Sequence, residues 1–201
     1  MSYEGWVWDL VVLAAAQAAG DDAGMDRSFA RLLEAGREVE VEEALLQSYL
    51  FLGFPSAIES LRRWRNRKAE PAVAAPEDWN LWLERGEEVC ATVYGDHYVP
   101  LRQNIARFHP DLDRWMVAEG YGKVLGRPGL GLGIRELLIV AMLVVSGERG
   151  RRQLRSHLRG ALNAGVAPQD VEEAIRQAGA FAASDNRELA FKLWAMINGK
   201  K

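Results

Sequence analysis

Cysteine is nearly missing from this sequence: Cys90 is the only one in 201 residues. An intramolecular disulfide is therefore excluded, and so is chemistry that needs two thiols of one chain. A lone thiol suits a reducing compartment, so we expect a cytoplasmic protein. A single cysteine in a helical segment is more often a small buried apolar residue than a nucleophile.

Long apolar runs and a strong excess of one charge are missing as well. The longest apolar run, Leu137 to Val145, is far shorter than the roughly 20 residues that span a bilayer. The first residues lack the basic segment of a signal peptide. The net charge is −3, which gives no global reason to bind nucleic acid. We expect neither a membrane nor nucleic acid as a partner.

Strand patterns are the third absence. Apolar residues recur at three- and four-residue steps or form runs too long for a strand, which predicts an all-α fold of antiparallel helix hairpins. The expected helices cover residues 5–19, 25–35, 39–65 (with Pro55 the place for a bend), 76–93, 133–146, 150–165 and 168–197. A short helix near Leu101 and a helix capped by Asp111 that ends before Arg127 complete the set.

Residues 9–59 and 136–189 look like two copies of one unit. Asp9 and Glu136 each open an apolar stretch that reaches a glycine eleven residues later. The segments 32–36 and 161–165 align, as do 41–45 and 171–175. We interpret the pattern as two fused helical-hairpin repeats. An Ala/Pro-rich stretch suggests an N-terminal repeat over 1–67, a linker over 68–78 and a C-terminal domain over 79–201.

Several of these segments resemble carboxymuconolactone decarboxylases. The likeness rests on Leu83–Val89 with Tyr94-Gly95-Asp96, on the turn Gly126–Leu130, and on Arg135–Leu138, Ser156–Gly165 and Val171–Ile175. It covers about residues 79–197. The first repeat resembles the shorter core of the same superfamily, which includes the alkylhydroperoxidase D-like peroxidases. The resemblance implies the all-helical alkylhydroperoxidase D-like fold and a ring-like homo-oligomer, a trimer or a hexamer, with sites near subunit contacts.

The resemblance also implies site residues. Glu136 and His157 match family positions for an acidic residue and a histidine, so they are the expected catalytic pair. Asp9 and Ser28 hold those positions in the first repeat, which therefore looks catalytically empty. The peroxidase branch carries a Cys-x-x-Cys pair that the matching region 147–152 lacks, which argues against dithiol peroxidase chemistry.

Spacing alone allows the same pair to meet. Eleven residues of helix from Glu136 to the turn rise about 16 Å, and the return helix brings His157 back toward the level of Glu136. A carboxylate can orient an imidazole that then moves protons. A purely structural ion pair, or a histidine that faces solvent, fits the spacing equally well.

Arginines crowd this second hairpin. Three arginines, Arg151, Arg155 and Arg159, recur every fourth residue. At this spacing, repulsion between like charges destabilises a helix. An anionic ligand would offset the repulsion, and so would acidic groups of another helix or subunit; a solvated charged face is the third reading. We take Arg135, Arg155 and Arg159 as candidates for substrate binding.

Two classes of function remain open. The first is a carboxymuconolactone decarboxylase-like enzyme, a decarboxylase or related lyase that acts on a small anionic metabolite and needs no metal or organic cofactor. The second is a non-enzymatic, oligomeric binding or scaffold member of the fold. A peroxidase that uses Cys90 alone is a distant third. An enzyme requires Glu136, His157 and arginines to converge on a cavity, whereas a scaffold would turn the arginines toward another chain.

Overall fold

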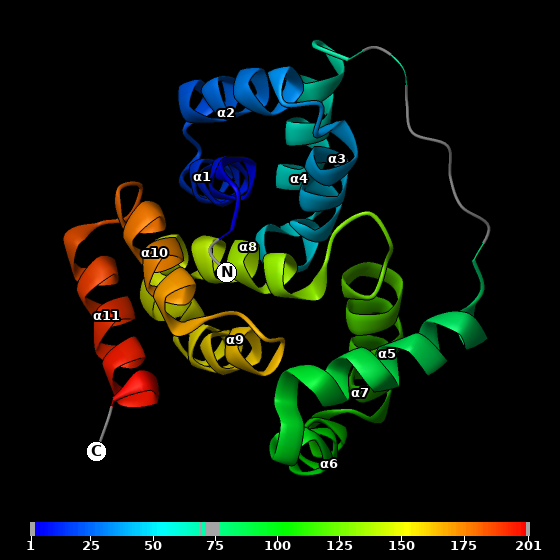
Figure 1. Cartoon of the computed structure of the whole chain (residues 1–201). Coiled ribbons are helices and arrows are strands. Elements are labelled where there is room, and N and C mark those ends of the chain that lie inside the picture. The colour runs from blue at the N-terminus through cyan, green and yellow to red at the C-terminus, as the bar shows by residue number, and fades with distance from the viewer. Residues whose placement is uncertain (1–2, 69, 71–76, 200–201) are drawn as a thin grey trace. The chain divides into compact units, whose positions relative to one another are not determined.

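The structure, a computed structural model, describes residues 3–68, 70 and 77–199. Every regular element in these ranges is a helix, which confirms the predicted all-α fold (Figure 1). The chain forms two compact units, unit 1 with residues 1–72 and 129–201, and unit 2 with residues 73–128. Residues 79–201, expected as one domain, are thus shared between the two units. The expected linker, 68–78, lies largely outside the described residues.

Unit 1 contains two runs of four α-helices in the same order. The first run is α1 (Gly5–Ala19), α2 (Asp22–Glu34), α3 (Glu38–Gln47) and α4 (Tyr49–Arg65). The second is α8 (Leu132–Ser146), α9 (Arg151–Asn163), α10 (Pro168–Gly179) and α11 (Ser184–Asn198), with a 3-10 turn η3 (Gly147–Gly150) before α9. The indole of Trp64 donates to Glu42 at 3.2 Å, and that of Trp194 donates to Glu172 at 3.5 Å. Such matching contacts are what two copies of one unit would produce.

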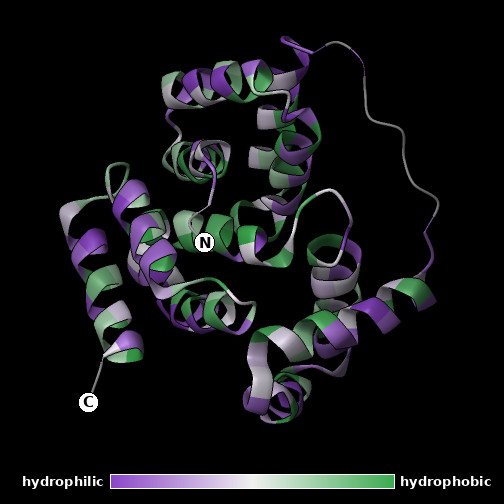
Figure 2. Ribbon diagram, viewed as in Figure 1, coloured by the Kyte–Doolittle hydropathy of each residue, from purple (hydrophilic) through white to green (hydrophobic). Residues whose placement is uncertain are grey.

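The core of unit 1 is built around α8. All residues from Arg135 to Val144 are buried, and Figure 2 shows hydrophobic green along most of this helix. A helix that is apolar on all sides is stable only when other elements surround it. Helices α1, α9 and α10 pack against α8 and provide that cover. Residues on α8 are therefore held in a close-packed setting.

Two expected long helices are each divided. The predicted helix 39–65 is α3 followed by α4, and the break inside α4 lies at Gly53 (φ 80°, ψ 161°) and not at Pro55. Glycine adopts a positive φ without the steric cost that a Cβ would bring. The predicted helix 168–197 is divided at residues 180–183 into α10 and α11.

Unit 2 consists of α5 (Trp79–Tyr94), the 3-10 turn η1 (Gly95–His97), α6 (Tyr98–Phe108), α7 (Pro110–Trp115) and the π-helix η2 (Met116–Leu125). The residue that caps α7 is His109, whose Nδ1 accepts the backbone N–H of Asp111 at 3.1 Å, so the expected cap at Asp111 was wrong by two residues. Glycines let α5 and η2 touch through their backbones. A Cβ on Gly122 would lie 1.7 Å from the carbonyl oxygen of Trp82, and one on Gly86 would lie 2.1 Å from that of Val117.

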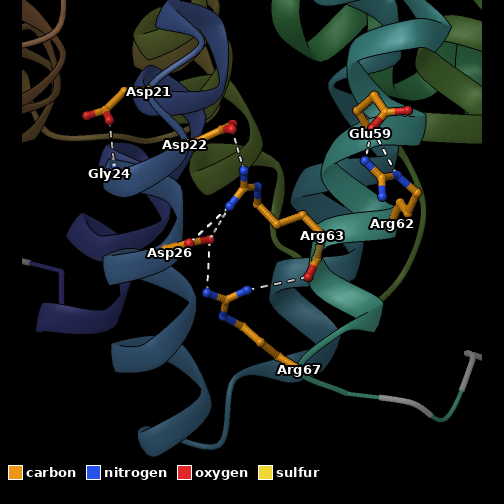
Figure 3. A network of polar contacts seen from close by, with 8 residues as sticks. All are labelled: Asp21, Asp22, Gly24, Asp26, Glu59, Arg62, Arg63 and Arg67. Carbon is orange, nitrogen blue, oxygen red and sulfur yellow. Dashed lines mark hydrogen bonds and ion pairs between the residues drawn. The ribbon is translucent and has the colours of Figure 1, made fainter.

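Ionic contacts link the helices of unit 1 in two different settings. Near the surface, Arg63 on α4 pairs with Asp22 and Asp26 on α2, and Arg67 also reaches Asp26 (Figure 3). In the interior, the guanidinium of Arg135 on α8 is fully buried and donates to Glu43 Oε2 on α3 at 2.7 Å. The buried pair lies in a low-dielectric setting, where losing one charge costs far more than at the surface.

The glycine contact in unit 2 predicts a sharp steric effect. Gly122→Ala should push α5 and η2 apart and destabilise unit 2 by about 2–3 kcal/mol or more, because backbone cannot yield as a flexible side chain can. Thermal unfolding and hydrogen exchange of peptides from residues 77–128 measure the loss. Gly120→Ala is the matched control, since a Cβ there has no heavy atom within 4 Å. Equal stability of the two variants would contradict the close approach.

The buried pair in unit 1 predicts a large electrostatic effect. Glu43→Gln keeps the shape of the side chain but removes the carboxylate charge that faces the buried guanidinium of Arg135, so the free energy of unfolding should fall by about 3 kcal/mol. Urea denaturation measures it. The double variant Glu43→Leu/Arg135→Met should recover much of the loss, because neither charge of the pair remains. Arg176→Ala, which breaks an exposed pair with Glu173, is the comparison. If Glu43→Gln lost no more stability than Arg176→Ala, the large contribution expected of the buried pair would be refuted.

Candidate active site in unit 1

The structure brings Glu136 and His157 together. Glu136 lies on α8 and His157 on α9, and Nδ1 of the imidazole lies 2.8 Å from Oε2 of the carboxylate. Both residues are buried, with exposed fractions of 0% for Glu136 and 4% for His157. The spacing argument placed the two at the same level of the hairpin, and the geometry agrees. Their role in catalysis is a separate matter.

The hydrogen bond between Glu136 and His157 has a donor and an acceptor that can be assigned. A carboxylate accepts hydrogen bonds, so Nδ1 carries the proton that is donated to Glu136. The other ring nitrogen, Nε2, then remains to exchange a proton with another molecule. The second carboxylate oxygen, Oε1 of Glu136, is buried and has no hydrogen-bond partner among the described residues. An unsatisfied buried oxygen is costly, and such groups are common at functional sites.

An aromatic ring from the first helical run covers the histidine. The ring of Phe51 on α4 lies edge-to-face with the imidazole of His157, with centroids 5.4 Å apart and planes at 83°. This is a favourable geometry for two rings and excludes water from that side of the imidazole. The first run therefore contributes to the surroundings of His157, although Ser28 stands at its own corresponding position.

A pocket of about 600 Å³ opens where the ends of α1 and α8 meet the beginnings of α4 and α9. Its lining combines apolar and polar residues: Ala18, Leu50, Phe51, Leu143, Val145, Ser146, Arg149, Gly150 and Gln153. The volume lies in the range typical of small-molecule sites, which combine an apolar wall with a few polar groups.

Phe51 connects this pocket with the buried pair. Neither Glu136 nor His157 is among the lining residues, yet Gln153 precedes His157 by one turn of α9 and Leu143 follows Glu136 by two turns of α8. The same face of each helix thus carries a lining residue and a member of the pair. Phe51 belongs to both: it lines the pocket, and its ring contacts the imidazole of His157.

The arginines expected to bind substrate lie elsewhere. Arg135 is directed into the interior, toward Glu43, and also donates to the carbonyl of Leu130 at 3.1 Å. Arg155 is exposed and Arg159 is half-buried; neither lines the pocket. Arg149 does line it, from the turn between α8 and α9. None of Arg149, Phe51 and Gln153 was among the site residues expected from the sequence.

Other chemistry finds less support in the geometry. The thiol of Cys90 is fully buried in α5, so the peroxidase hypothesis has no exposed nucleophile to work with. In the part of the chain that the structure describes, no three His, Cys, Asp or Glu residues are grouped as metal ligands. The described helices include none with the length and hydrophobicity needed to cross a membrane.

Comparison with known proteins gives the family. The pattern of the carboxymuconolactone decarboxylase family matches residues 110–196, which include both members of the pair. A 4-carboxymuconolactone decarboxylase of Acinetobacter baylyi is 31% identical over 100 residues, which are 49% of this chain and 73% of that protein. Peroxisomal protein 2 of Schizosaccharomyces pombe is 31% identical over 141 residues, which are 67% of this chain and 65% of that protein. On this similarity and its all-helical fold, the chain belongs to the carboxymuconolactone decarboxylase family.

Proposed function

We propose that this protein is a lyase that removes carbon dioxide from a small anionic molecule bound in the pocket of unit 1. The observation that carries the proposal is the buried Glu136–His157 pair, whose histidine contacts Phe51, a residue that also lines an open pocket. The similarity to a protein named 4-carboxymuconolactone decarboxylase favours decarboxylation over other lyase reactions. The scheme requires no group beyond the side chains of this chain.

The pocket offers complementary contacts for such a molecule. Arg149 is exposed on its rim, and no ion pair joins it to the described residues, so its guanidinium is open to a carboxylate. Gln153 provides an amide, and Leu50 and Leu143 provide apolar surface for the body of the molecule. A charged end held at Arg149 would place the molecule in the pocket that Phe51 also lines.

The reaction would use His157 as the proton donor. The bond that breaks joins the carboxyl carbon of the substrate to the neighbouring substrate carbon. Its electron pair stays on that neighbouring carbon as a carbanion or dienolate, and carbon dioxide leaves. The imidazolium of His157 then gives its Nε2 proton to that carbon. Glu136 stabilises the imidazolium through Nδ1 and keeps the ring oriented. A water-poor surrounding strengthens these electrostatic contributions.

A non-enzymatic binding or scaffold protein is the second candidate. Arg155 and Arg159 form no hydrogen bond or ion pair with the described residues, and acidic groups of another chain would satisfy them. Homo-oligomerisation as a trimer or hexamer is part of both candidates and stays a proposal. Light scattering after size exclusion, at low and high salt, would show the subunit number and whether charged contacts hold the assembly.

The proton donor is tested by His157→Gln and Glu136→Gln. With a panel of carboxylated lactones and related carboxylates, release of carbon dioxide is measured for each protein. Once a substrate is found, kcat should fall by about 10²–10⁴-fold in His157→Gln, because general acid catalysis contributes that much. His109→Gln is the control, an exposed histidine in unit 2 that should leave kcat unchanged. Unchanged turnover in His157→Gln would remove this residue from the mechanism.

The anion-binding role is tested by Arg149→Ala. Loss of a charge-assisted hydrogen bond of about 1.5–3 kcal/mol should raise KM, or Kd measured by calorimetry, by roughly 10–100-fold. Arg155→Ala should change either constant by less than about twofold. A larger effect in Arg155→Ala than in Arg149→Ala would place the anion outside the pocket. Binding that needs Arg149, without turnover of any tested carboxylate, would favour the binding-protein candidate.

A further inference from the structure

The buried pair and the open pocket are close but do not communicate in this conformation. His157 is almost fully buried and Glu136 completely so, and neither lines the pocket. Proton transfer requires the donor to come within hydrogen-bond distance of the reacting atom. Some part of the wall must therefore move before any molecule in the pocket can reach Nε2 of His157.

Phe51 is the part of the wall that lies against the histidine. It is half-buried, it lines the pocket, and its ring contacts the imidazole of His157. Its neighbour Leu50 also lines the pocket. The pocket of about 600 Å³ gives the ring of Phe51 space to rotate away from His157.

The backbone around Phe51 can be moved locally. Gly53, two residues later, has φ 80° and interrupts α4, and Pro55 cannot donate a backbone hydrogen bond. The turn that carries Phe51 is thus separated from the longer part of α4. On its other side it is anchored by Ser48, whose hydroxyl accepts from Gln17 at 2.8 Å and donates to the carbonyl of Leu45 at 2.7 Å. A short turn with one anchor and one glycine joint is a suitable support for a moving side chain.

Glu136 supplies a second, independent indication. Its Oε1 is fully buried without a hydrogen-bond partner among the described residues. A closed structural ion pair would satisfy both oxygens, because an unpaired buried oxygen carries a desolvation cost. The pair is therefore arranged to receive a further polar group when it becomes accessible.

We propose that Phe51 is a gate that shields the Glu136–His157 pair from the pocket and opens to admit the reacting end of the bound molecule. The proposal rests on the proposed function for its purpose, since the gate would keep water away from the proton donor until substrate is in place. It also gives the first helical run a role: α4 supplies the gate for a pair that lies entirely on the second run.

The gate can be tested without any substrate, by the access of a histidine-specific reagent. Diethylpyrocarbonate reacts when Nε2 of an imidazole attacks its carbonyl carbon and displaces ethyl carbonate, which breaks down to ethanol and carbon dioxide. The chain has three histidines. His97 and His109 are exposed and serve as internal references, and peptide mass spectrometry gives a rate constant for each site.

In the wild-type protein, His157 should react at least about tenfold more slowly than His109. Phe51→Ala should raise the rate constant of His157 at least tenfold and leave those of His97 and His109 unchanged. Phe51→Tyr retains a covering ring and should keep the wild-type rate. Leu50→Ala is the matched control, because it shortens a neighbouring pocket-lining side chain and leaves the ring of Phe51 against the imidazole.

Three results would overturn the proposal: a wild-type His157 as reactive as His109, a His157 that stays protected in Phe51→Ala, or equal acceleration in Leu50→Ala. Circular dichroism establishes that each variant is folded; should Phe51→Ala not fold, Phe51→Leu replaces it, with an expected intermediate rate. The readout involves no turnover, so failure of the gate and failure of the proposed lyase activity are seen separately. With a verified substrate, Phe51→Ala should additionally change the pH profile of kcat, which a purely structural residue would leave unaltered.

Discussion

The buried ion pair between Arg135 and Glu43 is the contact on which the geometry of the site depends. Arg135 precedes Glu136 on α8, and Glu43 lies on α3, which leads directly into the turn that carries Phe51. Fixing α3 against α8 therefore fixes the aromatic wall against the carboxylate and, through it, against His157. Such a pair is retained at a considerable desolvation cost, which suggests that specifying one arrangement of the helices matters more here than maximal stability.

The two helical runs of unit 1 contribute different residues to the candidate site. The second run carries the carboxylate, the imidazole and the rim arginine Arg149, whereas the first provides Phe51 and apolar lining. At the positions that match the pair, the first run holds Asp9, which pairs with Arg31 at 2.6 Å, and Ser28, whose buried hydroxyl has no partner among the described residues. The carboxylate–imidazole pair thus lies on the second run alone.

How far the sequence could predict the structure varies with the kind of feature. The spacing of apolar residues predicted most helices, and α1 begins and ends at the expected residues, because helical hydrogen bonds are local and Gly20 takes a left-handed φ of 68° at its end. It missed the division of 39–65 and placed the break at proline, since glycine breaks a helix only where packing demands a positive φ. For the site, spacing along one hairpin was enough to bring Glu136 and His157 together. Three further arginines chosen by charge did not line the pocket.

The sequence by itself determined the all-helical class, the family and the carboxylate–imidazole pair, because each depends on residues close together in the chain or on a regular repeat. Only the tertiary structure decided that Arg135 serves a buried ion pair, that Arg149 faces the pocket, and that Phe51 covers the histidine. These outcomes depend on which helices from distant parts of the chain pack against one another. Charge and hydrophobicity state what a side chain can do, and packing decides where it is able to do it.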